Sequence, residues 1–238
     1  MTRFIAIVSG KGGVGKTTTA INIGQALTDL GKRVIVVDAN LVTPNIGIHL
    51  GIMNPEGTIN KFLRKEKDIK DITYHHESGL TFIPASPSYS EFQKTNPQKL
   101  TEIFEHLDNT ADYVLIDAPS GLGYEVSQIL KNSDEALIVT TPNLSSVMDA
   151  LKTIQMARAH DNTIPGIVLN MTHWASRHEL TPQEIERIVN YPILAKIKVD
   201  SSIRKSLHRQ VPLNYIQPHS RSARQFKNIA EYITLHKK

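Results

Sequence analysis

Short apolar runs rich in β-branched residues recur along this chain, separated by segments whose apolar positions have helical spacing. The runs are Phe4–Val8, Val34–Val37, Leu80–Pro84, Tyr113–Ile116, Ala136–Val139 and Gly166–Leu169. The runs Val34–Val37 and Val114–Ile116 are continuously apolar, as strands are when both faces of a sheet are covered. Strands that alternate with helices indicate βαβ units. The pattern therefore predicts an α/β fold, a doubly wound and mostly parallel sheet with helices on both faces.

Several helix boundaries are readable as well. Asn96 precedes a proline at a first helical position, and Thr181 begins a capping box. The run Thr17–Leu30 is compatible with a helix, and a final helix is predicted from about Ser220 to Leu235 with its apolar residues on one face. We expect that face to pack in the core. The alternative is that it lies on a membrane surface.

Length and composition narrow the class of protein. A chain of 238 residues, 40% of them hydrophobic, can bury one large core, and we expect a single domain over residues 1–238. No apolar stretch approaches the ~18–20 residues of a membrane span, and the amino terminus lacks a signal-peptide pattern. These features predict a soluble cytoplasmic protein. The absence of cysteine excludes disulfides and cysteine ligation of metals or iron–sulfur clusters.

The first apolar run leads directly into a glycine-rich turn, because residues 10–17 read Gly-Lys-Gly-Gly-Val-Gly-Lys-Thr. A strand that enters such a turn and continues as a helix predicts a phosphate-binding loop for a nucleoside triphosphate, ATP or ADP. Lys16 would contact the β- and γ-phosphates, and the Thr17 hydroxyl would bind Mg²⁺. The residues expected to hold the nucleotide here are Gly12, Gly13, Val14, Gly15, Lys16, Thr17 and Thr18.

A second lysine, Lys11, lies inside the loop, where an ordinary phosphate loop does not need one. It is either a solvated side chain or a cation that reaches the phosphates of a second subunit. The stretch Ser9–Thr19 resembles the deviant Walker A loop of the MinD/ParA ATPases, P-loop NTPases of the SIMIBI class. That resemblance implies the second role for Lys11 and an ATP-dependent homodimer.

A carboxylate follows the buried run that ends at Ile116. Asp117 is placed to hold Mg²⁺ or its waters beside the loop, because ligands bind at the carboxyl ends of parallel strands. The stretch Asp117-Ala-Pro119-Ser120-Gly121 resembles the Walker B and switch II motif of the same family. The resemblance implies that the Gly121 backbone senses the γ-phosphate.

The run Val34–Val37 ends in Asp38-Ala39-Asn40, where MinD and ParA proteins have Asp-x-Asp. The second acid of that motif helps to position the attacking water. On this resemblance Asp38 and Asn40 join Lys11 and Lys16 as catalytic candidates. Asparagine can orient water but cannot accept a proton as a carboxylate does, so we expect slow hydrolysis. The alternative is that Asp38 acts alone and Asn40 caps a turn.

Two further positions match the family's adenine-binding region. Asn170 follows the run Gly166–Leu169 and would pair with the purine edge, although asparagine at a strand end is also a common turn former. Asp200 matches the acid of the family's Pro-x-Asp loop around the base, but Lys198 stands where proline is usual.

Charge is distributed unevenly along the chain. Residues 196–238 hold ten lysines and arginines against two acidic residues, so this segment is strongly basic in a chain of net charge +4. Such a segment either binds the phosphates of nonspecific DNA or of anionic lipid, or it forms solvated helix faces. MinD proteins usually carry a further amphipathic segment after this point, so we expect this chain to reach a membrane surface only through a partner.

These observations favour a MinD-like ATPase that dimerises with ATP and positions structures within the cell. The resemblance also implies an unidentified regulatory or cargo protein. Three alternatives remain open: a module that binds ATP without hydrolysing it, a ParA-like ATPase that binds DNA, and a metallocentre-insertion ATPase. The last is disfavoured by the absence of cysteine.

Overall fold

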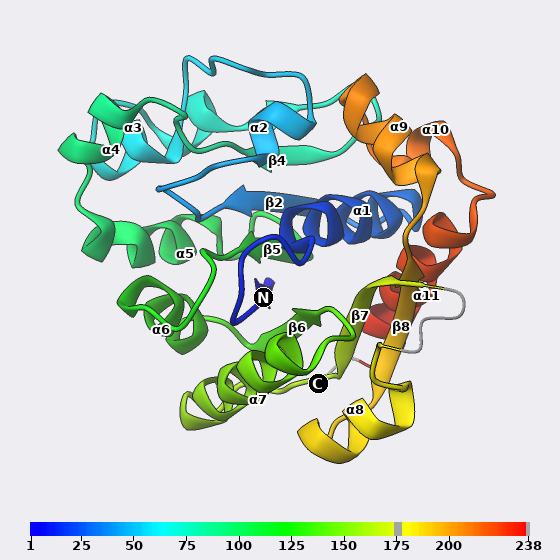
Figure 1. Cartoon of the computed structure of the whole chain (residues 1–238). Helices are drawn as coiled ribbons and strands as arrows, with labels where there is room; N and C mark the ends of the chain where they lie inside the picture. Colours follow the sequence, from blue (N-terminus) through cyan, green and yellow to red (C-terminus); the bar gives the residue numbers. More distant parts are fainter. Residues whose placement is uncertain (174–177, 237–238) are drawn as a thin grey trace.

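The computed structural model describes residues 1–173 and 178–236. Its strands are β1 (Arg3–Val8), β2 (Val34–Asp38), β3 (Tyr74–His75), β4 (Thr81–Ile83), β5 (Tyr113–Asp117), β6 (Glu135–Thr140), β7 (Ile167–Thr172) and β8 (Ile193–Lys198). They form one eight-stranded sheet in the order β3-β4-β2-β5-β1-β6-β7-β8 (Figure 1). The short edge strand β3 runs antiparallel to β4, and the other neighbours in this order are parallel.

Helices cover both faces of the sheet. They are α1 (Lys16–Asp29), α2 (Ile46–His49), α3 (Ile59–Leu63), α4 (Tyr89–Lys94), α5 (Glu102–Leu107), α6 (Tyr124–Lys131), α7 (Leu144–Ala159), α8 (Pro182–Val189), α9 (Ser201–Arg209), α10 (Leu213–Ile216) and α11 (Arg221–Leu235), with 3-10 helices η1 (Ile69–Ile72) and η2 (Pro97–Thr101). Residues of α1, α2, α10 and α11 share one core with the sheet, and residues of α3, α5, α6, α7 and α8 share the other. The predicted doubly wound α/β fold is confirmed.

Strand β1 shows how the sequence pattern produces these two cores. Ile5 and Ile7 point to the α1 side, while Ala6 and Val8 point to the α6 side, because successive side chains of a strand face opposite ways. All four are fully buried. A strand covered on both faces cannot contain a polar face, which explains its continuous apolar run.

Helix α1 lies close to the sheet because of one glycine. A Cβ on Gly24 would lie 2.5 Å from Val36 Cγ2 on β2 and 3.3 Å from a Leu80 methyl group. Glycine is unfavourable inside a helix, so the close approach accounts for its presence. This packing fixes the helix that starts at the glycine-rich loop.

The final helix α11 packs as the sequence predicts. Ser220 caps it by accepting a hydrogen bond from the Ala223 N–H at 3.1 Å. Its apolar residues Ala223, Phe226, Ile229, Ala230 and Ile233 are each at most 1% exposed. They belong to the core that α11 shares with α1, so this face is not available to a lipid surface. Among the described residues, no helix combines the length and apolar character that a membrane crossing requires.

Some boundaries differ from the sequence prediction. The capping box at Thr181 opens α8 as expected, but Asn96 caps the 3-10 helix η2 instead of an α-helix. Strand β7 runs to Thr172, so Asn170 lies inside the strand and not beyond its end. The edge strand β8 was not predicted, because Lys196 and Lys198 interrupt its apolar positions.

Candidate functional site

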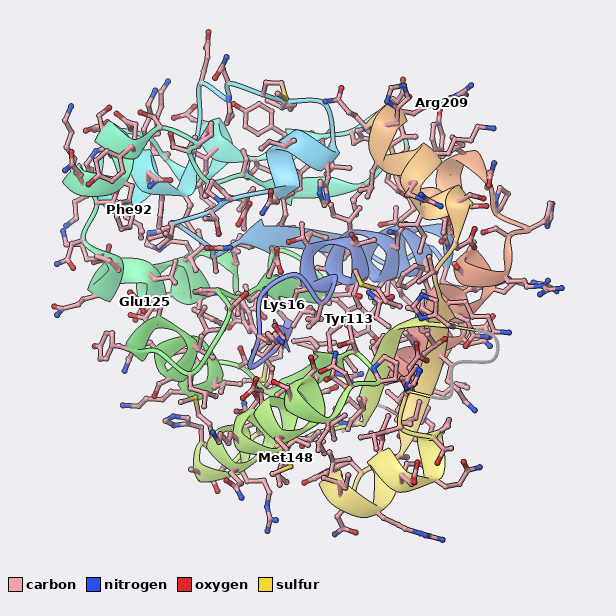
Figure 2. All side chains as sticks on the ribbon, in the orientation of Figure 1. Lys16, Phe92, Tyr113, Glu125, Met148 and Arg209 are labelled. Atoms are coloured by element: carbon pink, nitrogen blue, oxygen red, sulfur yellow. The ribbon has the colours of Figure 1, made fainter. Side chains whose placement is uncertain are left out.

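The glycine-rich loop connects β1 to α1 at the carboxyl edge of the sheet (Figure 1). Gly13 and Gly15 have φ angles of 77° and 92°, a region in which glycine is favoured. The Lys16 side chain is buried, and its Nζ donates to Ser120 Oγ at 3.3 Å. Figure 2 shows Lys16 near the centre of this face. The loop therefore presents its backbone and one lysine where a helix begins, the usual arrangement for binding phosphate.

Thr17 and Asp117 meet beside this loop. The Thr17 hydroxyl donates to Asp117 Oδ2 at 2.5 Å, and Asp117 Oδ1 is buried without a hydrogen-bond partner. Burial raises the pKa of Asp117 to about 6, while the charge of Lys16 and the Thr17 hydrogen bond oppose the rise. An unpartnered buried carboxylate oxygen next to a hydroxyl fits Mg²⁺, which takes oxygen ligands. Thr17 and Asp117 are the residues that would hold the ion or its waters.

Asp38 lies fully buried at the end of β2, next to Asp117 in the paired strand β5. Its carboxylate accepts hydrogen bonds from the backbone N–H groups of Asn40, Asn45 and Ile46. Burial, followed by the charge of Asp117, raises its pKa to about 8 against these hydrogen bonds. Asp38 therefore organises the loop that leads into α2, in addition to any role in catalysis.

Asn40 closes a turn in the same loop. Its Oδ1 accepts from the Thr43 N–H at 3.1 Å, and its Nδ2 donates to the Thr43 carbonyl at 2.9 Å. Both ends of the side-chain amide are thus engaged within the loop. This geometry favours the turn-capping alternative for Asn40.

Lys11 lies at the exposed tip of the loop. Its carbonyl accepts from Ser9 Oγ at 2.8 Å. Among the described residues, its ammonium group makes no hydrogen bond or ion pair. An exposed cation without such a partner is available to a second molecule.

The segment after Asp117 is attached to the loop at two points. The Gly121 N–H donates to the Ser9 carbonyl at 3.0 Å, and Ser120 accepts from Lys16. Gly121 has φ = 93°, so glycine is favoured at this turn. The amide expected to sense the γ-phosphate is therefore already occupied. Ser120 was not predicted as a site residue, although its place between Pro119 and Gly121 put a hydroxyl beside the phosphate loop.

Asn170 packs against the loop from β7. Its Nδ2 donates to the Val14 carbonyl at 2.7 Å, which leaves the side-chain oxygen for another donor. The same Nδ2 occupies the space that a Cβ on Gly15 would need. Asn170 therefore holds the start of α1 in place.

Asp200 caps α9. Its Oδ1 accepts from the Ser202 N–H and its Oδ2 from the Ser222 hydroxyl, both at 2.7 Å. Burial acts to raise its pKa, but the hydrogen bonds from Ser222 and Ser202 outweigh it and the pKa is lowered. Oδ1 thus caps α9, and Oδ2 ties the start of α9 to α11.

The fold and this site define the class of protein: a P-loop nucleotide-binding protein. Comparison with known proteins supports this. The family model "ParA: NUBPL iron-transfer P-loop NTPase" matches residues 1–234. An uncharacterised ATP-binding protein of Methanocaldococcus jannaschii is 34% identical over 226 residues, which are 95% of this chain and 85% of that protein.

Solved structures give the same result. The cell division ATPase MinD of Pyrococcus furiosus has a TM-score of 0.93 and 33% identity over 99% of both chains. The septum site-determining protein MinD of Pyrococcus horikoshii, in complex with Mg-ADP, has a TM-score of 0.92 and 31% identity, covering 98% of this chain and 96% of that one. The chain belongs to the MinD/ParA family of P-loop NTPases, and the Mg-ADP in the Pyrococcus horikoshii protein is the kind of ligand that the sequence predicts here.

Proposed function

We propose that this chain is an ATP hydrolase that works as a dimerising switch in intracellular positioning, as the names of its MinD relatives suggest. The proposal is carried by the exposed ammonium group of Lys11, which has no hydrogen-bond or ion-pair partner within residues 1–173 and 178–236. In the dimer, Lys11 of each copy contacts the triphosphate held by the other. Cations supplied in this way contribute about 10³–10⁵ in rate.

Separate residues of the chain bind the phosphates, hold Mg²⁺ and respond to the γ-phosphate. Lys16 holds the β- and γ-phosphates, and the Thr17 hydroxyl with Asp117 holds Mg²⁺ or its waters, which neutralise phosphate charge. Gly121 must leave the Ser9 carbonyl before its N–H can reach a phosphate oxygen. That exchange would let the segment leading into α6 respond to the γ-phosphate. Hydrolysis removes the shared triphosphate contacts and releases the pair.

The nucleotide face also offers apolar surface for a second copy. Four large side chains on it are at least 40% exposed: Leu122, Tyr124, Leu144 and Met148. The first two lie at the start of α6 and the others in the first turns of α7, both of which begin at the carboxyl edge of the sheet. Exposed apolar side chains gathered on one face are typical of association sites.

Sizing the protein with ATP and with ADP tests the switch. Wild type is expected to form a dimer with ATP and a monomer with ADP, whereas Lys11→Ala stays monomeric with both. Lys67→Ala, which changes an exposed lysine after α3, is the matched control and should dimerise normally. A monomer under every nucleotide would refute the switch and leave a nucleotide-binding module.

The rate of hydrolysis separates the enzyme from a module that keeps its ATP. We expect slow multiple-turnover phosphate release, because Asn40 cannot act as a carboxylate and its amide is engaged by Thr43. No phosphate release above that of ATP alone would favour the non-hydrolysing module. Brisk hydrolysis that Asn40→Ala leaves unchanged would contradict the link between Asn40 and the slow rate.

A ParA-like function on DNA is the second candidate, and α9 favours it. Arg204, Lys205 and Arg209 are exposed on this helix, and Lys205 and Arg209, which are four residues apart, lie on one side of it. Figure 2 shows Arg209 at the outer rim of the molecule. DNA binding that requires ATP and weakens steeply with salt would support this function. Binding to anionic vesicles through an added partner protein would support the MinD-like one.

An iron-transfer role, which the matching family model names for one of its members, has less support. The chain has no cysteine to ligate an iron–sulfur cluster. Among the described residues, no group of three histidine, aspartate or glutamate side chains is placed to hold a metal ion.

A further inference from the structure

Met171 has a strained backbone in the middle of a strand. It lies in β7 with φ = 55°, the left-handed region that residues other than glycine adopt at a cost. Within residues 1–173 and 178–236, five other non-glycine residues have such angles, and all of them follow the ends of helices, where this conformation is common. These five are Lys65, Asn109, Asp161, Asn190 and Gln210. The strain inside β7 is therefore not explained by a helix end.

A β-bulge in β7 accompanies this conformation. Between the paired residues Leu169 and Thr172, β7 has two residues, Asn170 and Met171, where β8 has only Ile197. Consecutive side chains of a regular strand point to opposite faces of the sheet. The extra residue breaks this alternation, so that Asn170 and Met171 turn toward the same part of the molecule.

Both side chains of the bulge reach the phosphate loop at Gly15. A Cβ built on Gly15 would lie 2.1 Å from Asn170 Nδ2 and 3.7 Å from Met171 Cε. The Asn170 amide also donates to the Val14 carbonyl, so this residue alone fixes the loop. Met171 belongs to neither hydrophobic core and is 40% exposed. The fold therefore does not depend on the thioether, which remains as an exposed apolar group next to the loop.

The order of the strands indicates which part of a bound nucleotide would lie at Met171. Asp117, expected to hold Mg²⁺, ends β5, and Gly121, expected to respond to the γ-phosphate, follows it. β5 lies on one side of β1, and β7 lies on the other side, beyond β6. A nucleotide whose phosphates bind the loop with the γ-phosphate toward β5 therefore directs its ribose and base toward β7.

We propose that Met171 contacts the base of the nucleotide, with its thioether packed against the face of the ring and the strained bulge holding it there. Thioether groups make favourable contacts with aromatic rings. The oxygen of the Asn170 amide is left beside it as an acceptor for a donor on the edge of the base. An apolar surface with a few polar groups is the usual lining of a ligand site. The inference rests on the nucleotide binding of the proposed function, but not on dimerisation or hydrolysis.

Isothermal titration calorimetry with Mg-ADP and with Mg-pyrophosphate separates a contact with the base from a contact with the phosphates. ADP is used because the proposed dimer requires ATP. Contacts between a thioether and an aromatic ring change an affinity by roughly two- to twelvefold. Met171→Ala and Met171→Gly should therefore bind Mg-ADP at least about threefold more weakly than wild type, with unchanged affinity for Mg-pyrophosphate. Met171→Leu keeps the apolar bulk and should stay within about twofold of wild type for both ligands.

The matched control is Met53→Ala. Met53 is another exposed methionine, and its sulfur accepts from Gln210 Nε2 at 3.7 Å. This variant should bind both ligands as wild type does. Urea titrations test the strain itself: Met171→Gly should unfold at a higher urea concentration than Met171→Ala, because glycine adopts the left-handed region without the penalty. A structural role for the methionine would instead lower stability and both affinities together.

Three outcomes would overturn the proposal. Unchanged ADP affinity in Met171→Ala and Met171→Gly would show that the thioether does not contact the base. Equal losses for ADP and pyrophosphate would show that Met171 acts on the phosphate loop instead. Wild type that binds neither ligand would refute the nucleotide site as well, so failure of the proposed function is distinguishable from failure of the base contact alone.

Discussion

At the residue scale, side chains of the site serve the fold and the chemistry together. Asp38 and Asn170, placed in the site by their likeness to a family, also hold loops in shape through hydrogen bonds to backbone groups. Ser120 connects the phosphate loop, through Lys16, with the segment that follows Asp117. These hydrogen bonds have measurable consequences.

Ser120→Ala should tighten ADP binding, because Lys16 no longer has to leave a hydroxyl partner before it contacts phosphate. A hydrogen bond of this kind contributes about 0.5–1.5 kcal/mol, which corresponds to a roughly two- to tenfold change in affinity. Isothermal titration calorimetry measures it. Ser127→Ala, at a hydroxyl that contacts His160 far from the loop, is the control. Weaker ADP binding in the Ser120 variant would show that the hydroxyl binds nucleotide directly.

The raised pKa of Asp38 predicts that the stability of the nucleotide-free protein depends on pH. Its pKa is raised from 3.8 to about 8 on folding, so the folded state holds a proton that the unfolded state has lost. The free energy of unfolding therefore falls as pH rises through this window, by up to about 1.4 kcal/mol per pH unit. Asp38→Asn should show a flatter profile in denaturant titrations with EDTA at pH 5, 6.5 and 8. Parallel profiles for wild type and variant would contradict the raised pKa.

At the element scale, the sequence predicted what depends on local pattern. Continuous apolar runs identified the central strands, and the capping residues located α8 and α11. The strand β8 escaped prediction because an edge strand has one polar side, and lysines there break the apolar run. The phosphate loop was predicted from its glycine spacing, and the roles of Lys11 and Gly121 came from likeness to a family. The contact of Gly121 with Ser9 joins distant parts of the chain, which no local pattern reports.

Helix α1 offers a test of packing between elements. Gly24→Ala should lower the free energy of unfolding by about 1–2 kcal/mol, since overpacking costs about 1–3 kcal/mol and better helix propensity returns up to about 1 kcal/mol. The clash is with Val36 Cγ2. The double variant Gly24→Ala/Val36→Ala should lose less free energy of unfolding than the sum of the losses in the two single variants. Strict additivity in denaturant titrations would show that the helix moves instead.

At the scale of the whole molecule, the phosphate loop and the exposed apolar side chains both lie at the carboxyl edge of the sheet. Figure 2 shows Met148 on α7, on the same face as Lys16. A second copy that shares the triphosphates would therefore also cover these apolar side chains.

Met148→Lys should prevent the ATP-dependent dimer without weakening ADP binding to the monomer. Its side chain is 43% exposed on α7, and a charge placed there would be buried without a partner in the proposed interface. Analytical ultracentrifugation with ATP measures the effect. Lys152→Glu, one turn further along α7, shows how far the interface extends. A Met148 variant that dimerises as well as wild type would place the interface elsewhere.

The contact between Gly15 and Asn170 limits the order in which substitutions can accumulate at these two positions. The amide of Asn170 fills the space that a Cβ on Gly15 would need. A mutational path that enlarges position 15 must therefore first shrink position 170, and that step removes the hydrogen bond to Val14. The order of substitutions is constrained in this way even though the two codons are far apart in the gene.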